Sequence, residues 1–221
     1  MRANDGYQVA LFPLSGFHIS QTDYDTASHG GGAEYWATDY LAWGSNGRIY
    51  RCPCYAPCDI KLVFVNQTNA VAVWESVNRV HLANGMLDFL TITCYHDNDI
   101  SDGSYPYNIG QIITQGHIFF KTGTGGHATG DHLHLETGYG KYISSSSGPA
   151  GTPEYKYHIT DYTSPKRLHN YEALYINDTD PIQTPEHYNW VEYVEPSPMH
   201  GYKGSKFPWV LYARKFRNKR R

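Results

Sequence analysis

At 221 residues, the chain is long enough for one well-filled core or for one domain with an appendage. Charged residues make up only 18% of it, whereas tyrosine occurs 20 times and glycine 21 times, a composition that argues against a mainly helical protein and predicts a mainly β one. The net charge of −3 argues against nucleic acid as the main partner, because the chain before residue 203 carries 21 acidic and ten basic residues and repels phosphate.

The first residues do not show the pattern of a secretory leader. MRANDGYQVALFPLSGF lacks a basic start, an apolar stretch and a small-residue cleavage site, so we expect no secretory signal. No later segment is apolar over the length needed to span a bilayer, and we expect no transmembrane segment. A substrate outside the cell would then require another route of delivery.

From about Tyr7 to Glu136, short apolar runs alternate with turn signals, the pattern of consecutive strands. The turn signals are GSNG (44–47), NQTN (66–69), NG (84–85), SDGS (101–104) and TGTGG (122–126). The runs between them predict strands at Ile49–Tyr50, Asp59–Asn66, Ala70–Glu75, Arg79–Leu82, Asp88–His96, Gln111–Ile113, Ile118–Phe120 and His132–Thr137. We therefore expect an antiparallel β-sheet core, packed as a sandwich or a partial barrel.

Four cysteines lie at positions 52, 54, 58 and 94. Their C-x-C-x3-C run does not match the paired C-x2-C spacing of common structural zinc sites. Without a secretory signal the reduced form is favoured. We expect buried free thiols, with a disulfide involving Cys94 and a cysteine-bound metal as the alternatives.

The character of the sequence changes after residue 143. SSSSGPAG opens a stretch, 144–167, that we expect to be a flexible insertion. NYEALYIND (170–178) predicts one last strand, which would complete a domain covering 1–178. The remaining residues, 179–221, are rich in aromatic residues and proline, and we expect an irregular C-terminal extension.

The extension ends in a basic tail. Residues 203–221 hold eight Lys or Arg and no Asp or Glu. The ordinary interpretation is a solvated or loosely docked terminus. The functional alternative is contact with a polyanion such as teichoic acid or nucleic acid.

The strongest local signal for chemistry is GDHLHLE (130–136). On a strand, residues two apart face the same side, so His132 and His134 present two imidazoles to one spot while Leu133 and Leu135 face the core. This arrangement suits two ligands of one metal ion, or one ligand beside a base. The ordinary interpretation is two strand histidines on a solvated face.

Three further residues are candidates to complete such a site. A catalytic zinc ion commonly has three protein ligands and an open position for water, and His29 in SHGGG and Asp39 in WATDYLAW are the upstream candidates. His96 ends an apolar strand in TITCYHDND, where active-site side chains are often placed. Taken singly, each is more simply a loop, capping or strand-end residue.

Together these residues resemble the lysostaphin-type, or LytM-like, zinc endopeptidases. That family pairs an N-terminal His…Asp element with a later H-x-H in a stretch similar to G-x-T-G-x-H-L-H-F-E, and GGHATGDHLHLE reproduces this stretch with Leu135 in place of Phe. CYAPCDIKLV (54–63) and IGQIITQGHIFFKTGTGG (109–126) resemble the segments between the two elements. The resemblance covers residues 17–137, about half of the chain.

The first element departs from the family pattern. His29 and Asp39 are ten residues apart, whereas the family has H-x3-D, so we expect the intervening GGGAEYWAT to loop out. The alternatives, in another register or as bystanders, are His18, Asp23, Glu34 and His127.

The resemblance implies a Zn²⁺ ion bound by His29, Asp39 and His134, with a water in the open position. His132 would take the proton of this water and pass it to the leaving amine, and His96 would donate to the oxyanion. Geometry alone also allows His132 to be the ligand and His134 the base.

The activity that the resemblance implies is hydrolysis of the stem peptides or cross-bridges of bacterial peptidoglycan by a zinc metalloendopeptidase. Phage-encoded members often lack a signal peptide, as we expect of this chain. Such a protein would be made in the host cytoplasm and act on the cell wall after release at lysis or as part of a virion. The alternatives are a non-catalytic LytM-like wall-binding protein and a structural phage protein.

Overall fold

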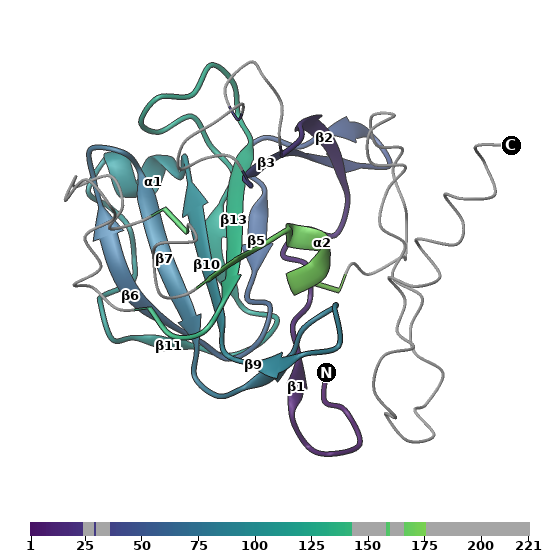
Figure 1. Ribbon diagram of the computed structural model, residues 1–221. Helices are drawn as coiled ribbons and strands as arrows, with labels where there is room; N and C mark the ends of the chain where they lie inside the picture. The colour runs from purple at the N-terminus through teal and green to yellow at the C-terminus, as the bar shows by residue number, and fades with distance from the viewer. Residues whose placement is uncertain (24–28, 30–35, 143–157, 160–165, 176–221) are drawn as a thin grey trace, which may run out of the picture.

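The computed structural model describes residues 1–23, 29, 36–142, 158–159 and 166–175 (Figure 1). Within these residues the fold is mainly β, as the composition predicts, and strand pairing is antiparallel except between two short strands. The expected extension at 179–221 with its basic tail, and most of the expected insertion at 144–167, lie outside the described residues.

One large sheet forms the body of the described part of the chain. Its strands, in spatial order, are β11 (Ile112–Ile113), β6 (Ile60–Asn66), β7 (Val71–Ser76), β10 (Leu90–Tyr95), β13 (Leu133–Tyr139), β3 (Thr38–Gly44) and β2 (Phe17–Gln21). Two short strands join at its sides, β14 (Lys166–Leu168) against β13 and β4 (Gly47–Arg48) against β3. Figure 1 shows β7, β10 and β13 running side by side through the centre.

Smaller elements surround this sheet. β1 (Gln8–Val9), β8 (Val80–His81) and β9 (Leu87–Asp88) form a small sheet in which β1 and β8 are parallel, and β5 (Pro53–Tyr55) pairs with β12 (Ile118–Lys121). Among the described residues the helices are single turns, α1 (Asn98–Ser101) and α2 (Asn170–Ala173). In the described part of the chain, no helix has the length and apolar character needed to cross a membrane.

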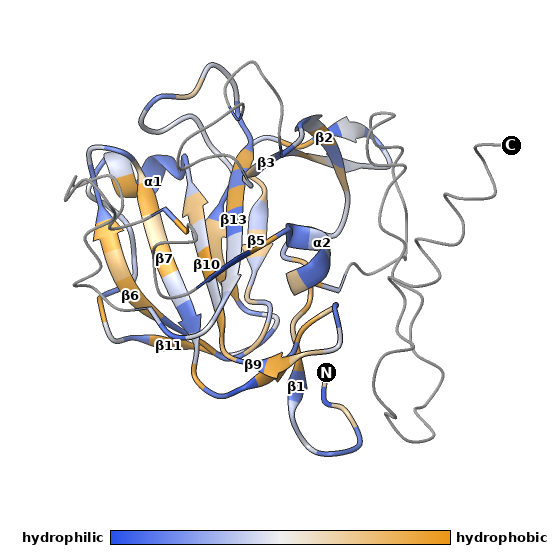
Figure 2. Ribbon diagram, in the orientation of Figure 1, coloured by the Kyte–Doolittle hydropathy of each residue, from blue (hydrophilic) through white to orange (hydrophobic). Residues whose placement is uncertain are grey.

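The core lies between the large sheet and the β5–β12 pair. All residues of β7 and of β10 are buried, as expected for central strands covered on both faces, and the apolar character of β6, β7 and β10 is visible in Figure 2. Trp74 of β7 meets Phe119 of β12 edge-to-face, with ring centroids 5.5 Å apart. The two layers give a sandwich-like core, and no closed barrel is formed by the described strands.

Two of the strand predictions are wrong. Ile49 and Tyr50 are 40% and 64% exposed and follow β4, because the GSNG turn closes a short hairpin whose second strand ends at Arg48. The segment predicted as the last strand begins as helix α2. The backbone N–H of His169 donates to Glu172 Oε2 at 3.3 Å, a capping interaction that favours a helical turn over a strand.

The four cysteines are all free and buried, which confirms the expectation of reduced thiols in the interior. Burial raises the pKa of Cys54 and of Cys94 well above the usual value of a thiol, and also raises the pKa of Cys52. Because the thiolate is the reactive form, raised pKa values keep these groups inert in the folded protein.

We therefore expect the native protein to react with Ellman's reagent at pH 8 far more slowly than free cysteine does. In guanidinium chloride without reductant, all four thiols should react. Rapid labelling of Cys54 or Cys94 in the folded protein, or fewer than four reactive thiols after unfolding, would contradict this structure.

Candidate metal centre

The centre of the site is a row of side chains across three neighbouring strands. Tyr95 of β10 lies opposite His134 of β13, and His134 lies opposite Asp39 of β3. Side chains directly opposite each other in antiparallel strands have Cβ atoms about 4.5–5.5 Å apart, so these three meet on one face of the sheet. The strand register thus places Asp39 next to His134, although the two residues are far apart in the sequence.

Local packing explains why Asp39 faces this way. Its neighbour Tyr40 is buried against Phe12 and Phe17, with ring centroids 4.9 and 5.2 Å away. Because successive residues of a strand face opposite sides, anchoring Tyr40 in the core turns Asp39 to the other side. His134 is placed in the same manner, since its neighbours in β13 are fully buried leucines.

His29 completes a compact group of three possible ligands. His29 Nε2 lies 3.6 Å and His134 Nδ1 2.9 Å from Asp39 Oδ1, and one ligand atom from each residue lies within 4.8 Å of the others. In a tetrahedral zinc site with bonds of 2.0–2.1 Å, ligand atoms are about 3.3 Å apart. The distances of both imidazole nitrogens to Asp39 Oδ1 are within a few tenths of an ångström of this spacing, and two imidazoles with one carboxylate are a donor set that suits zinc.

A hydrogen bond behind His29 and a carboxylate behind His134 orient these two rings. His29 Nδ1–H donates to the carbonyl of Thr22 at 3.0 Å, which turns Nε2 toward Asp39. His134 Nε2 lies 3.5 Å from Glu136 Oε1, on the far side of its ring from Asp39. Metal-binding histidines commonly have such a carbonyl or carboxylate on the second ring nitrogen.

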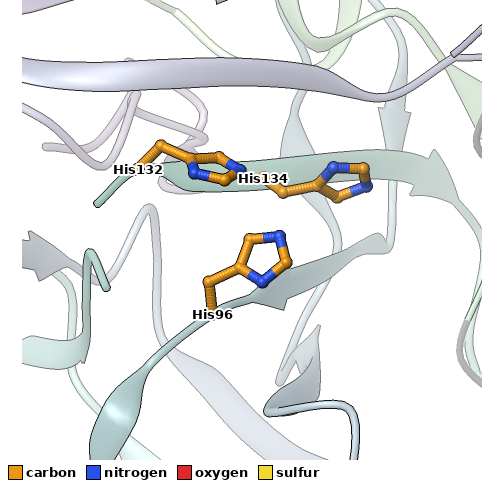
Figure 3. Close-up of side chains that lie close together, drawn as sticks. All are labelled: His96, His132 and His134. Atoms are coloured by element: carbon orange, nitrogen blue, oxygen red, sulfur yellow. The ribbon is translucent and has the colours of Figure 1, made fainter. Parts of the chain in front are cut away.

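Two further histidines border this group (Figure 3). The His96 ring, at the end of β10, points toward His132 and His134, and the His96 and His132 centroids are 4.5 Å apart. His96 Nδ1–H donates to the Gly125 carbonyl at 2.9 Å, and His132 Nδ1–H to the Gly130 carbonyl at 2.7 Å. In the neutral rings, each Nε2 is then a hydrogen-bond acceptor.

The described residues thus contain two overlapping groups that could hold an ion. The first is His29, Asp39 and His134, and the second is His96, His132 and His134, each with its ligand atoms within 4.8 Å of one another. They share His134. His132 also faces the first group, since its Nε2 lies 3.6 Å from Asp39 Oδ2. All five site residues predicted from the sequence are therefore gathered in one place.

The electrostatics of this place favour a positive charge next to Asp39. Burial alone would raise the pKa of Asp39, but the hydrogen bond from His134 and the nearby histidines lower it. Burial alone would lower the pKa of His134, but hydrogen bonds to Asp39 and Glu136 raise it to about 10. Burial, together with His134 and His132, lowers the pKa of His96 to about 3. A positive charge beside Asp39, carried by an imidazolium or by a metal ion, fits this charge distribution.

The alternative ligands lie elsewhere. Asp23 pairs with His169, and the His18 ring stacks on Trp43 with centroids 4.2 Å apart. His127 is exposed in a turn. Glu34 falls outside the described residues.

A buried polar cluster behind His134, which we call the Glu136 cluster, was not expected from the sequence. Glu136 Oε1 accepts from Tyr95 Oη at 3.0 Å and lies 2.6 Å from His158 Nδ1, and Glu136 Oε2 accepts from the Ile159 N–H at 2.7 Å. Burial alone would raise the pKa of Glu136, but His158 and His134 lower it to about 2. Because alternate residues of a strand face the same side, the pattern that pairs His132 with His134 also places Glu136 on that side. The position of Glu136 near the site was therefore predictable from the sequence.

Comparison with known sequences finds a phage protein that is similar to this chain. No family model matches this chain. The chain is similar to morphogenesis protein 1 of Bacillus phage B103, with 33% identity over 134 residues, which are 61% of this chain and 33% of that protein. The chain therefore spans about a third of the length of this curated relative.

Solved structures similar to this one include peptidases. One is a zinc-containing peptidase from Vibrio cholerae, with 18% identity over 59% of this chain and 37% of that chain, and a TM-score of 0.42. Another is the antimicrobial peptidase lysostaphin from Staphylococcus simulans, with 13% identity over 57% of this chain and 44% of that chain, and a TM-score of 0.37. The phage protein and these peptidases are what the chain is similar to, and the roles of the site residues rest on their own geometry.

Proposed function

We propose that the protein is a zinc-dependent endopeptidase of the lysostaphin type that hydrolyses peptide bonds in the stem peptides or cross-bridges of bacterial peptidoglycan. The observation that carries the proposal is the convergence of His29, Asp39 and His134 within 4.8 Å, with His96 and His132 beside them. One carboxylate and two imidazoles leave a divalent ion with a net charge of about +1 and an open coordination position.

His29 Nε2, one oxygen of Asp39 and His134 Nδ1 would hold the ion. When bound, zinc polarises the scissile carbonyl and lowers the pKa of a coordinated water from 15.7 toward 7. The chain itself contributes orientation, because Thr22 and Glu136 fix the rings of the two histidine ligands.

His132 is the proposed general base. Its Nε2 is an acceptor in the neutral ring, and Asp39 Oδ2, 3.6 Å away, would stabilise the imidazolium formed when it takes a proton from the attacking water. The same imidazolium then donates the proton to the leaving amine.

The role of His96 differs from the oxyanion donor that the resemblance implies. Because its Nδ1–H is bound to the Gly125 carbonyl, neutral His96 has only an acceptor on Nε2. We assign it the orientation of the attacking water through a hydrogen bond from that water to Nε2.

The phage relative favours a virion-associated role over a free lysin. Morphogenesis protein 1 of Bacillus phage B103 is 33% identical to this chain, and its name refers to phage assembly. We propose that this chain opens the wall from within a virion. In the non-catalytic alternative, a structural phage protein of the same fold would bind the wall without cutting it.

The proposal is tested with the protein purified without added metal. We expect one zinc ion per chain by elemental analysis, and peptide fragments released from purified Bacillus peptidoglycan by mass spectrometry. A chelator should abolish release, and added zinc should restore it. Wall binding without release of any fragment, in zinc-loaded protein, would favour the non-catalytic alternative.

A further inference from the structure

Arg51 lies beside the site, in the connection between β4 and β5, and contacts several segments at once. Its Nη1 donates to Asp97 Oδ1 and to the Thr122 carbonyl, both at 2.8 Å, and its Nη2 donates to Asp99 Oδ1 at 2.6 Å. Its backbone N–H donates to Asp131 Oδ2 at 3.0 Å. Arg51 has a φ of 53°, in the left-handed region that non-glycine residues rarely adopt. We call these residues the Arg51 clamp.

Two of the carboxylates held by Arg51 are direct neighbours of the proposed catalytic histidines. Asp97 follows His96, and Asp131 precedes His132. Both carboxylates are buried, with exposed fractions of 1% for Asp97 and 6% for Asp131. The clamp thus joins Asp97 and Asp131, and with them the two backbone segments that carry the His96 and His132 rings. These segments are far apart in the sequence.

The segment 121–122 also binds both aspartates. Thr122 Oγ1–H donates to Asp131 Oδ1 at 2.6 Å, and the Lys121 N–H donates to Asp97 Oδ2 at 2.8 Å. Each carboxylate therefore contacts both Arg51 and the 121–122 segment. Both aspartates are bound through both of their oxygens.

Gly123 shows how closely these segments approach each other. It exchanges two backbone hydrogen bonds with His132, at 3.1 and 3.0 Å. A Cβ at Gly123 would lie 2.2 Å from the His96 carbonyl oxygen and 2.8 Å from Arg51 Nη1. The segments carrying His96 and His132 are therefore packed in contact around the guanidinium group.

We propose that Arg51 is a positioning residue that fixes the separation and orientation of His96 and His132. The proposal rests on the proposed function, because it concerns the two histidines that act on the attacking water. Arg51 acts on the two rings indirectly. Its guanidinium group binds Asp97, and its backbone N–H binds Asp131.

A planar guanidinium group is suited to this task. Its two terminal nitrogens bind Asp97 and Asp99 at the same time as a carbonyl, and lysine offers a single ammonium that cannot reproduce this fork. Arg51→Lys keeps the positive charge near the buried Asp97 and the backbone N–H that binds Asp131. It removes the fork that holds Asp97, Asp99 and the carbonyl of Thr122, whose own hydroxyl binds Asp131. Misplacement of a catalytic group by about 1 Å can cost on the order of 100-fold in rate.

The test compares Arg51→Lys with the wild type in zinc-loaded protein on peptidoglycan fragments. We expect kcat to fall about 10- to 100-fold, with KM and zinc content unchanged. We also expect the Nδ1–H protons of His96 and His132, observed by ¹⁵N-edited NMR, to exchange faster with water in the variant than in the wild type.

Lys61→Arg is the matched control. Lys61 Nζ lies 2.8 Å from Glu75 Oε1, another buried carboxylate, on strands β6 and β7 away from both histidines. The control should keep kcat and both NMR signals. If Arg51→Lys does not fold, Asp97→Asn, which keeps the shape of the side chain, replaces it with the same expected results.

The outcomes separate this proposal from the proposed function. Wild-type protein without zinc or turnover overturns the proposed function. Active wild type together with a variant of unchanged kcat and unchanged Nδ1–H exchange overturns the positioning role alone. A fall in kcat that occurs only with loss of zinc or of thermal stability also overturns it, because Arg51 would then be purely structural.

Discussion

His134→Ala is expected to lose both the zinc and the activity, whereas His132→Ala keeps the zinc and loses turnover. The reason is geometric. His134 Nδ1 lies 2.9 Å from Asp39 Oδ1 and belongs to the proposed ligand group. His132 does not belong to this group, although its Nε2 lies 3.6 Å from the other oxygen of Asp39. Loss of a general base commonly costs about 10²- to 10⁴-fold in rate, and we expect a fall in this range for His132→Ala.

The same experiment distinguishes the two groups that share His134. If the ion is held by His29 and Asp39, then His29→Ala loses zinc and His96→Ala retains it. If the ion is held by His96 and His132, the results are reversed. The measurement is zinc per chain by elemental analysis, made on folded protein verified by circular dichroism.

His127→Ala is the control for these substitutions, because His127 is exposed in a turn and belongs to neither group. It should keep both the zinc and the activity. Full zinc occupancy in His134→Ala would contradict both ligand assignments at once.

Much of this site could be predicted from the sequence because it depends on strand alternation. The H-x-H pattern placed His132 and His134 on one face, and the end of an apolar run placed His96 at a strand terminus. The pairing of β13 with β3 was not predictable in this way. The strand carrying Asp39 was not among the predicted strands, because its register depends on contacts between distant segments such as Tyr40 with Phe12.

The supporting contacts were largely beyond a sequence-based prediction. Arg51 reaches Asp97 and Asp131 across 46 and 80 residues of sequence, and no local pattern specifies such a meeting. His158 lies in the stretch expected to be flexible, and yet its ring is buried against Glu136. Long-range polar contacts of this kind leave no periodic signal, whereas Glu136 did leave one through its position two residues after His134.

Glu136→Gln is expected to weaken zinc binding about 10- to 100-fold while the protein remains folded. Glu136 Oε1 lies 3.5 Å from His134 Nε2, and its negative charge near this nitrogen makes the ring a better metal ligand. Glutamine has nearly the same shape and keeps one acceptor oxygen, but it lacks the negative charge. The measurement is a competition between the protein and a chromogenic chelator, which reads zinc affinity without any assay of activity.

Glu136→Ala should be more severe and should act on folding as well. It would remove the acceptor of the buried Ile159 N–H, and also one of the contacts of Tyr95 Oη, which lies 2.7 Å from His158 Nδ1 as well. A buried donor left without an acceptor costs about 1–3 kcal/mol. Denaturant titration should therefore show a lower free energy of unfolding for Glu136→Ala than for Glu136→Gln.

Glu75→Gln provides the matched control for the charge. Glu75 is also a buried glutamate of the large sheet, and its partner is Lys61 and not a proposed metal ligand. Both glutamine variants change the same charge in the same layer, so any general effect on stability should be common to them. A loss of zinc affinity in Glu136→Gln alone would then locate the effect in the contact with His134. Equal zinc affinities in Glu136→Gln and wild type would mean that His134 binds without help from this carboxylate.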